Sequence, residues 1–257
     1  MGYIKLVEYY RPQVDNPVLI QGLPGVGLVG KLTADFLIKQ FKPEKFASIF
    51  SEYLTLPSGA LGVLLKSGNS IEIYSYDFYH IHAENADLIL LTAEVQPTTW
   101  GQYPMANQVL DFFKRLGGTT VVTMGGNVVQ RYENTVYACA SNAKLLKMLS
   151  KYRVLPLQGG EVTGACGLLA GLAPVKGMDS FCLLSSTRGA YPDPKAARRL
   201  LKVIDAMYGI NVDYSIVNKA IKDIEMALTL RREMNRIIQR ARGEIKPRSR
   251  EEIPYRG

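Results

Sequence analysis

Two long apolar runs limit the folds available to this chain more than any other feature of its sequence. One reads DLILLTAEV from Asp87, and the other reads TTVVTMGG from Thr119. Both contain β-branched residues, and neither alternates between apolar and polar positions, which is typical of strands covered on both faces. Such strands occur in sheets that carry helices on either side. The two runs therefore predict an α/β fold, built as a three-layer α/β/α sandwich.

Shorter apolar runs and amphipathic segments alternate along the chain up to about residue 210. The expected strands are 4–8, 17–21, 46–50, 62–65, 70–76, 88–93, 120–124, 136–139 and 180–185. The expected helices are 28–41, 105–116, 142–152, 164–172 and 195–208. Ser141 and Asp193 are suitable N-caps for the third and fifth helices, and Pro194 fits the first turn of the fifth.

Composition indicates a cytoplasmic globular protein. The 257 residues, 47% of them hydrophobic, are enough to bury a core without disulfide bonds or a structural metal. Cys139, Cys166 and Cys182 are odd in number and match no CxxC spacing, so no disulfide framework is expected. No segment approaches the roughly 18 consecutive apolar residues of a membrane span, and the first residues lack the apolar stretch of a signal peptide. We expect no membrane partner.

The C-terminal segment has a different pattern. Between residues 215 and 242, apolar residues recur every three or four positions, at Ala220, Ile224, Ala227, Leu230, Met234, Ile237 and Ala241. This near-heptad stripe predicts one long helix. The predicted organisation is an α/β/α domain over 1–212, a projecting amphipathic helix over 213–242 and a flexible basic tail over 243–257. The stripe is expected to pack against the domain or against other copies of the chain in a homo-oligomer.

The net charge of +8 is concentrated near the C-terminus, where residues 231–257 contain nine Lys or Arg and four Glu. Arginines along one helix face could neutralise nucleic-acid phosphates. However, Glu233, Glu244, Glu251 and Glu252 lie among them, and no aromatic stacking platform accompanies them. Nucleic-acid binding is therefore not expected.

A glycine-rich segment, QGLPGVGLVGKL, connects the second expected strand to the first expected helix. Gly25, Gly27 and Gly30 match the GxGxxG pattern of dinucleotide-binding loops, and the segment also reads GxxxxGK, as phosphate loops do. Glu52 lies about where a ribose-binding acid could follow. Leu32, however, replaces the Ser or Thr that would hold magnesium. The alternative is a tight turn in which the three glycines let the helix pack closely on the sheet, and we favour it and expect no cofactor.

Two further groups of residues could carry chemistry. His80, His82 and Glu84 alternate in YHIHAE like half of a zinc site, but the chain has no other histidine, so no metal is expected. Cys166 lies in VTGACGLLAG at the start of an expected helix, where a thiolate could be stabilised and a histidine or Glu161 could act as base. Small buried residues that pack a helix explain this segment as well. We expect no catalytic residue.

Aromatic side chains are dense in SYDFYHIH, and the single tryptophan, Trp100, lies in PTTWGQYP. Mixtures of polar and aromatic residues are common in interfaces. The same residues could instead cover one face of the sheet. Spacing alone does not separate these two interpretations.

Several segments, taken in order, resemble the proteasome assembly chaperone 2 family, including its archaeal members. They are GLPGVGLVGKLTADFLI, SEYLTLP, LTAEVQP, TMGG, GGEVTGACGLLAG and CLLSSTRGAYPDPKAARRLL, which together span most of residues 4–210. The resemblance implies a fold similar to that of purine nucleoside phosphorylases, but no catalysis. It implies a homo-oligomeric chaperone that binds proteasome α-subunits or the core particle, with or without a second assembly chaperone. The alternative is a nucleoside- or phosphate-binding enzyme that uses the glycine-rich segment.

The resemblance also concerns the last residues of the chain. Proteasome partners carry a terminal motif of a hydrophobic residue, a tyrosine and any residue, which docks in pockets between neighbouring α-subunits. Here Ile253, Tyr255, Arg256 and Gly257 are the expected contacts, but the tyrosine is third from the end instead of penultimate. The extra residue moves the C-terminal carboxylate up to about 3.5 Å further from the tyrosine ring than it is in the motif. A disordered end with no partner is the alternative.

Overall fold

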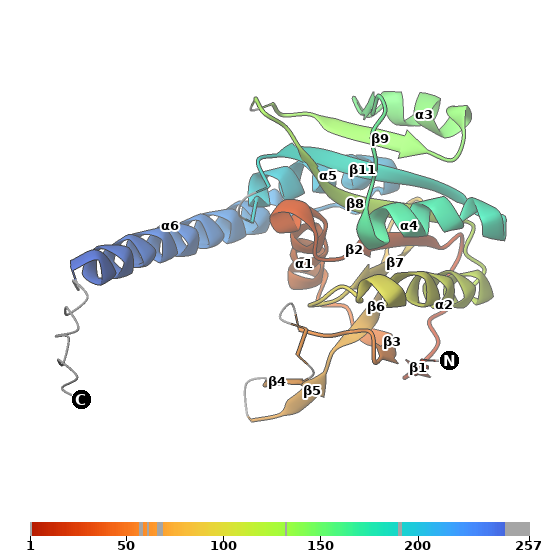
Figure 1. The fold of residues 1–257 in the computed structure, drawn as a ribbon. Coiled ribbons are helices and arrows are strands. Elements are labelled where there is room, and N and C mark those ends of the chain that lie inside the picture. Colours follow the sequence, from red (N-terminus) through yellow and green to blue (C-terminus); the bar gives the residue numbers. More distant parts are fainter. Residues whose placement is uncertain are drawn as a thin grey trace, which may run out of the picture. The chain divides into compact units, whose positions relative to one another are not determined.

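The chain forms an α/β domain and one long helix. The computed structural model describes residues 2–56, 59–60, 62–65, 69–131, 133–189 and 192–244, with side chains up to residue 238 (Figure 1). Contacts divide the chain into two units between Tyr214 and Ser215. The predicted boundaries at 212 and 242 stay predictions. Within the described residues, no helix combines the length and the apolar character that crossing a membrane requires.

One large sheet forms the centre of the domain. Among the described residues its strand order is β1-β3-β6-β7-β2-β8-β11-β9-β10, and β4 and β5 form a separate antiparallel pair. The bounds are β1 (Ile4–Glu8), β2 (Val18–Gly22), β3 (Lys45–Ser51), β4 (Val63–Leu65), β5 (Ile71–Ile73), β6 (Ser75–His82), β7 (Asp87–Thr92), β8 (Thr120–Val128), β9 (Val136–Ala140), β10 (Leu155–Pro156) and β11 (Asp179–Thr187).

The four central strands, β7, β2, β8 and β11, are parallel to one another. Every residue of β2 and of β7 is buried. The apolar run from Asp87 is β7 and the run from Thr119 continues into β8, so the prediction of central strands covered on both faces is confirmed.

Helices cover both faces of the sheet, which confirms the three-layer α/β/α architecture. The bounds are α1 (Val29–Phe41), α2 (Gln102–Arg115), α3 (Ala143–Ser150), α4 (Gly164–Leu172) and α5 (Pro194–Tyr208). α1 contacts α5 and the central strands, while α2 contacts α4, which lies on β8 and β11 (Figure 1). Leu19 and Val121 share a core cluster with residues of α2 and α4, whereas their neighbours Ile20 and Val122 are buried outside that cluster. Successive residues of one strand are therefore buried on opposite faces of the sheet.

Local predictions fail where a signal extends over only a few residues. Residues 70–76 were expected as one strand, but they divide between β5 and β6, and β6 continues to His82. The two-residue strand β10 was not predicted. The N-cap of α3 is Asn142, which accepts a hydrogen bond from the Leu145 amide, so the prediction for Ser141 is wrong by one residue. Asp193 caps α5 as predicted, accepting from the Ala196 amide at 2.9 Å.

α6 (Tyr214–Glu244) is a continuous helix of 31 residues, and all of it except its first residue belongs to the second unit. At about 1.5 Å per residue it is roughly 46 Å long. The prediction of one long C-terminal helix is confirmed.

Backbone contact between α1 and the sheet depends on two glycines. A Cβ built on Gly30 would lie 2.4 Å from the carbonyl oxygen of Met124 in β8. A Cβ on Gly22, in β2, would lie 2.6 Å from the Cβ of Ala34 and 2.7 Å from the carbonyl oxygen of Gly30. All three distances are too short for a real side chain. The helix and the sheet therefore touch through their main chains at this point.

Substitution of Gly30 by alanine should destabilise the domain, because the added methyl group meets backbone that no rotamer change can move. We expect a loss of about 1–3 kcal/mol in the free energy of unfolding. Denaturant unfolding followed by circular dichroism measures this loss.

Gly171→Ala in α4 is the matched control, since a Cβ there meets no atom within 4 Å. It should leave stability unchanged or raise it by up to about 1 kcal/mol, owing to the higher helix propensity of alanine. Equal stabilities of the two variants would contradict the close approach of α1.

Candidate functional site

The glycine-rich segment forms a tight turn whose surroundings are filled by protein. It runs from β2 through the short helix η1 (Val26–Leu28) into α1. Gly27 has a φ of 61°, its carbonyl accepts from the Asp193 amide at 2.8 Å, and a Cβ there would lie 3.0 Å from Thr187 Oγ1. The Val26 carbonyl lies against Gly126 of β8, where a Cβ would be only 2.6 Å away. The turn is therefore held between β8, β11 and the start of α5.

Gly25 differs from the other two glycines. Its backbone is extended, and the nearest neighbour of an added Cβ would be Gln96 Nε2 at 3.9 Å. No steric reason requires glycine at this position. The predicted structural role of Gly25 stays a prediction, whereas Gly27 and Gly30 occupy positions where a side chain causes strain.

Lys31, the lysine of the GxxxxGK pattern, is bound by two carboxylates. Its Nζ lies 2.6 Å from Asp35 Oδ1 and 3.2 Å from Glu94 Oε1, and its side chain is 12% exposed. Burial alone would lower the pKa of Lys31, but the two carboxylates outweigh burial and raise it. In a phosphate loop the lysine reaches the phosphates of the nucleotide. Here its charge is already neutralised within the domain.

Glu52 does not take the position of a ribose-binding acid. It is exposed after β3, and β6 and β7 lie between β3 and β2 in the sheet. In a dinucleotide-binding fold the acid follows the strand beside the first one. β3, which Glu52 follows, lies three strands away from β2, roughly 14 Å at about 4.8 Å per strand. The expectation for this residue is wrong because the sequence does not reveal the strand order.

A cavity of about 290 Å³ opens at the carboxyl ends of the central strands. The glycine-rich segment, the end of β8 and the start of α4 line it. In open α/β sheets ligands bind at this edge. Gln96 crosses the site, with its Nε2 donating to the Pro24 carbonyl and its Oε1 accepting from the Ala165 amide at 3.3 Å. The Ala165 amide, at the start of α4, is therefore occupied by a side chain of the protein.

The two histidines hold a carboxylate. His80 Nε2 and His82 Nδ1 lie 2.8 and 2.9 Å from Asp87 Oδ1, while Glu84 accepts from Asn211 at 2.9 Å. Burial would raise the pKa of Asp87, but the backbone amide of Asp15 and the two imidazoles outweigh burial and lower it. Among the described residues no cluster of side chains is suited to a metal ion.

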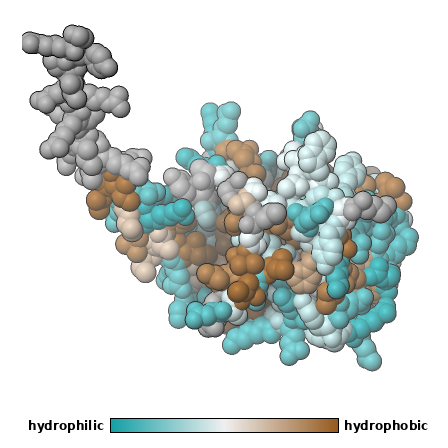
Figure 2. Space-filling model, turned by 60° about the horizontal axis from the view of Figure 1, so that its bottom comes forward, coloured by the Kyte–Doolittle hydropathy of each residue, from teal (hydrophilic) through white to brown (hydrophobic). Residues whose placement is uncertain are grey.

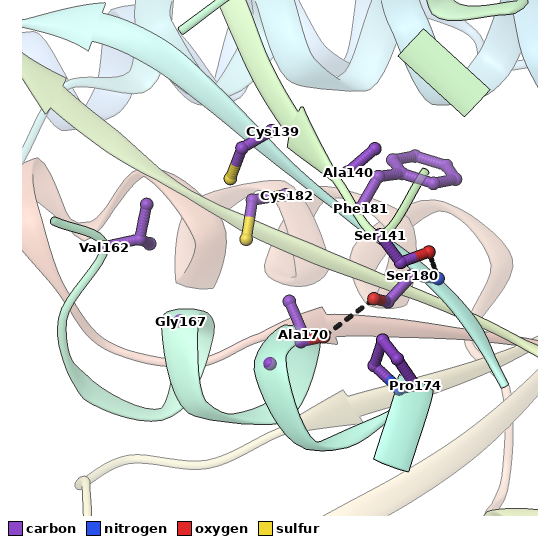
Figure 3. Close-up of a pocket in the computed structure, with 11 residues that line it drawn as sticks. Cys139, Ala140, Ser141, Val162, Gly167, Ala170, Pro174, Ser180, Phe181 and Cys182 are labelled. Atoms are coloured by element: carbon purple, nitrogen blue, oxygen red, sulfur yellow. Dashed lines mark hydrogen bonds between the residues drawn. The ribbon is translucent and has the colours of Figure 1, made fainter. Parts of the chain in front are cut away.

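The three cysteines lie close together on one side of the sheet. Cys139 and Cys182 are directly opposite each other in the antiparallel pair of β9 and β11, and Figure 3 shows their sulfurs on the side of α4. Cys166 comes from the first turn of α4, and its Sγ lies 3.4 Å from Thr123 Oγ1. The histidines considered as bases for Cys166 are engaged with Asp87, and Glu161 is exposed on the wall of the cavity.

The aromatic residues divide between core and surface. Tyr76 and Phe78 of β6 are buried, and the ring of Phe78 meets that of Phe112 edge-on at 5.0 Å. Trp100 is 86% exposed and Tyr103 is 61% exposed. Apolar side chains are exposed on the domain and along α6 (Figure 2). The run SYDFYHIH thus covers a sheet face, and Trp100 remains available for contact.

The apolar stripe of α6 changes from buried to exposed along the helix. Ala220 is buried, Ile224 is half-buried and Ala227 is exposed. Leu230, Met234 and Ile237 are 53%, 62% and 65% exposed. The side chain of Ala241 lies outside the described residues, as do Ile253, Tyr255, Arg256 and Gly257, so the contacts predicted for the tail stay predictions.

Comparisons with known proteins agree with this architecture. The PAC2 family model matches residues 19–230. Pyrococcus furiosus PbaB, described as an archaeal proteasome activator, has a TM-score of 0.79 and 30% identity, with 89% of this chain and 98% of PbaB covered. P. furiosus PbaA, described as an archaeal homolog of proteasome-assembly chaperone, has a TM-score of 0.75 and 26% identity, with 94% and 95% covered.

A relative of comparable length comes from Methanocaldococcus jannaschii. The uncharacterized protein MJ1210 is 30% identical over 247 residues, which cover 95% of this chain and 93% of that protein. The family model spans most of the chain, and the relatives align with it nearly from end to end. This chain belongs to the PAC2 family.

Proposed function

We propose that this chain is a non-enzymatic chaperone of proteasome assembly, which binds proteasome α-subunits or the core particle as a homo-oligomer. The observation that carries the proposal is the similarity to PbaB and PbaA over nearly their whole lengths. PbaB is described as a proteasome activator and PbaA as a homolog of a proteasome-assembly chaperone. The proposed action is binding alone, through surfaces that the domain and α6 present.

The glycine-rich turn supports binding over catalysis. Its lysine, Lys31, forms ion pairs with Asp35 and Glu94. The Ala165 amide, at the start of α4, already donates its hydrogen bond to Gln96 Oε1. A phosphate at this turn would have to displace an ion pair and a hydrogen bond that the domain already makes. Each displacement opposes binding, since charged and buried groups left without partners are costly.

The stripe on α6 supports self-association. Leu230, Met234 and Ile237 of the stripe are all more than half exposed. Met226, which is not one of the predicted stripe residues, precedes Leu230 by four positions and is 66% exposed. Residues spaced by three or four positions lie on one face of a helix. A row of exposed apolar side chains of this length is typical of a helix that packs against another protein surface. The proposed partner is α6 of another copy.

The alternative function, binding of a nucleoside or a phosphorylated small molecule, is favoured by one observation. The cavity of about 290 Å³ lies at the sheet edge where α/β folds bind ligands. The position of the cavity alone does not indicate a reaction, because function depends on the residues of a site and not on the fold.

Substitution of Leu230 by aspartate should weaken self-association. A buried leucine contributes about 1.5–3 kcal/mol, so its loss should raise the dissociation constant by at least roughly tenfold. Light scattering across a concentration series measures the shift towards the monomer.

Asn235→Asp is the matched control, because it introduces the same charge on another face of α6. It should keep the parent's oligomeric state. A parent chain that is monomeric at all concentrations, or a control that dissociates like Leu230→Asp, would contradict the assignment of the stripe.

Substitution of Tyr255 by alanine should weaken binding to the core particle of the same organism. Aromatic residues at the centre of an interface typically contribute about 2 kcal/mol or more, which corresponds to roughly 30-fold in affinity. Several tails on one oligomer would add to this effect through their high effective concentration. Co-sedimentation of the chain with purified core particle measures the loss.

Ser249→Ala, upstream in the same tail, is the control and should bind as the parent does. Deletion of residues 253–257 should reproduce the effect of Tyr255→Ala. Unchanged binding by both tail variants would show that the tail is not the contact.

Nucleosides, nucleotides and inorganic phosphate should not raise the melting temperature of the chain. A ligand present at about 100 times its Kd would stabilise the folded state by about 2.7 kcal/mol, a shift of roughly 5–10 °C for a domain of this size. Differential scanning fluorimetry detects a shift of this size.

A saturable rise in melting temperature that Lys31→Met removes would support the enzyme alternative over the chaperone proposal. The variant is informative because Lys31 is the single cation of the GxxxxGK pattern. Its loss alone should lower stability, since Asp35 and Glu94 would lose their common partner.

A further inference from the structure

The cysteines meet although they come from three separate elements. Cys139 and Cys182 face each other across β9 and β11, and Cys166 belongs to α4 on the face of the sheet that both sulfurs occupy. All three are free thiols. The proposed binding function uses none of them.

Thr123 connects two of the thiols. Cys166 Sγ donates to Thr123 Oγ1 at 3.4 Å, and Thr123 Oγ1 in turn donates to Cys182 Sγ at 2.9 Å. Cys182 Sγ also lies 3.8 Å from the carbonyl oxygen of Cys166. Because both sulfurs contact one oxygen atom, at 3.4 and 2.9 Å, they lie at most 6.3 Å apart. A disulfide requires that they approach to about 2.0 Å.

The two thiols differ in access and in acidity. Cys166 is half-buried and lines the cavity of about 290 Å³, whereas Cys182 is buried in the central sheet. Hydrogen bonding with Cys182 first, and then with Thr123, lowers the pKa of Cys166 against the effect of burial. A hydrogen bond with Cys139 would lower the pKa of Cys182. The hydrogen bond with Cys166 and burial outweigh it, so the pKa of Cys182 is raised. The more accessible sulfur is thus the one with the lowered pKa.

We propose that Cys166 is a peroxide-reactive thiol and that Cys182 resolves it as a disulfide. In the first step the Cys166 thiolate attacks one oxygen of hydrogen peroxide, so that an S–O bond forms, the O–O bond breaks and hydroxide leaves. In the second step the Cys182 sulfur attacks the sulfur of the Cys166 sulfenic acid, an S–S bond forms and the S–O bond breaks. The thiol proton of Cys182 leaves with the hydroxyl group as water. Two thiols are oxidised and one peroxide is reduced.

The structure predicts which sulfur pairs with Cys166. Cys182 lies between the other two cysteines, opposite Cys139 in the sheet and joined to Cys166 through Thr123. The disulfide would tie the start of α4 to β11 beside the cavity. Cys139 is not required for either step.

The test treats the fully reduced, full-length chain with a small excess of hydrogen peroxide. Free thiols are then counted under denaturing conditions, and linked peptides are identified by mass spectrometry without reduction. The parent should fall from three thiols to one, with Cys166 linked to Cys182. Cys139→Ala should fall from two thiols to none. Cys166→Ala should keep both of its thiols over the same period.

Cys182→Ala gives a second readout, because the Cys166 sulfenic acid should persist and be captured by a 1,3-dione probe. Loss of thiols in Cys166→Ala at the parent's rate would overturn the proposal in favour of the opposed pair Cys139 and Cys182. Two retained thiols in Cys139→Ala would overturn it as well. Peptide mapping of the parent needs no substitution, so a linkage other than Cys166 to Cys182 contradicts the proposal even if a variant fails to fold.

Discussion

Main-chain contact between α1 and the sheet is the constraint on which the rest of the domain depends. Gly22 and Gly30 remove the two side chains that would separate α1 from β2 and β8. With the helix this close, the turn before it is pressed against β8 and β11, and Gly27 must adopt a positive φ beside Thr187. Packing therefore explains two of the three glycines that resemble a nucleotide-binding loop, Gly27 and Gly30. A motif alone did not distinguish these uses, because both require a backbone without side chains.

The fold was predictable from the sequence where an apolar pattern extended over many residues. Prediction failed where a residue's role depended on contacts with residues far away in the sequence. The continuous apolar runs at Asp87 and Thr119 identified the central strands, because only a sheet covered on both faces buries them. Asp193 was recognisable as a cap from its position before Pro194. By contrast, Glu52 could not be placed without the strand order, and the engagement of His80 and His82 with Asp87 links residues on two paired strands. The meeting of Cys139, Cys166 and Cys182 likewise has no sequence signal, since their spacing matches no motif.

The cavity at the sheet edge indicates ligand binding, whereas the exposed apolar residues indicate contact with another protein. The cavity at the sheet edge has the position of a ligand site, but an ion pair at Lys31 and the amide of Gln96 already use the groups that would hold an anion. The exposed apolar residues of α6 and the exposed Trp100 have no such internal partner among the described contacts, and contact with another protein would remove them from water. Membership of the PAC2 family and the likeness to PbaB and PbaA are the basis of the proposal that this chain works by binding.

The proposal that most needs a test is that this chain contacts the proteasome and catalyses no turnover of a metabolite. Affinity purification from the native lysate, with the full-length chain as bait and quantitative mass spectrometry of the bound proteins, tests it most directly. Proteasome α-subunits should be enriched over a bait of unrelated fold. Absence of proteasome subunits from the bound fraction, together with turnover of a metabolite by the purified chain, would contradict it.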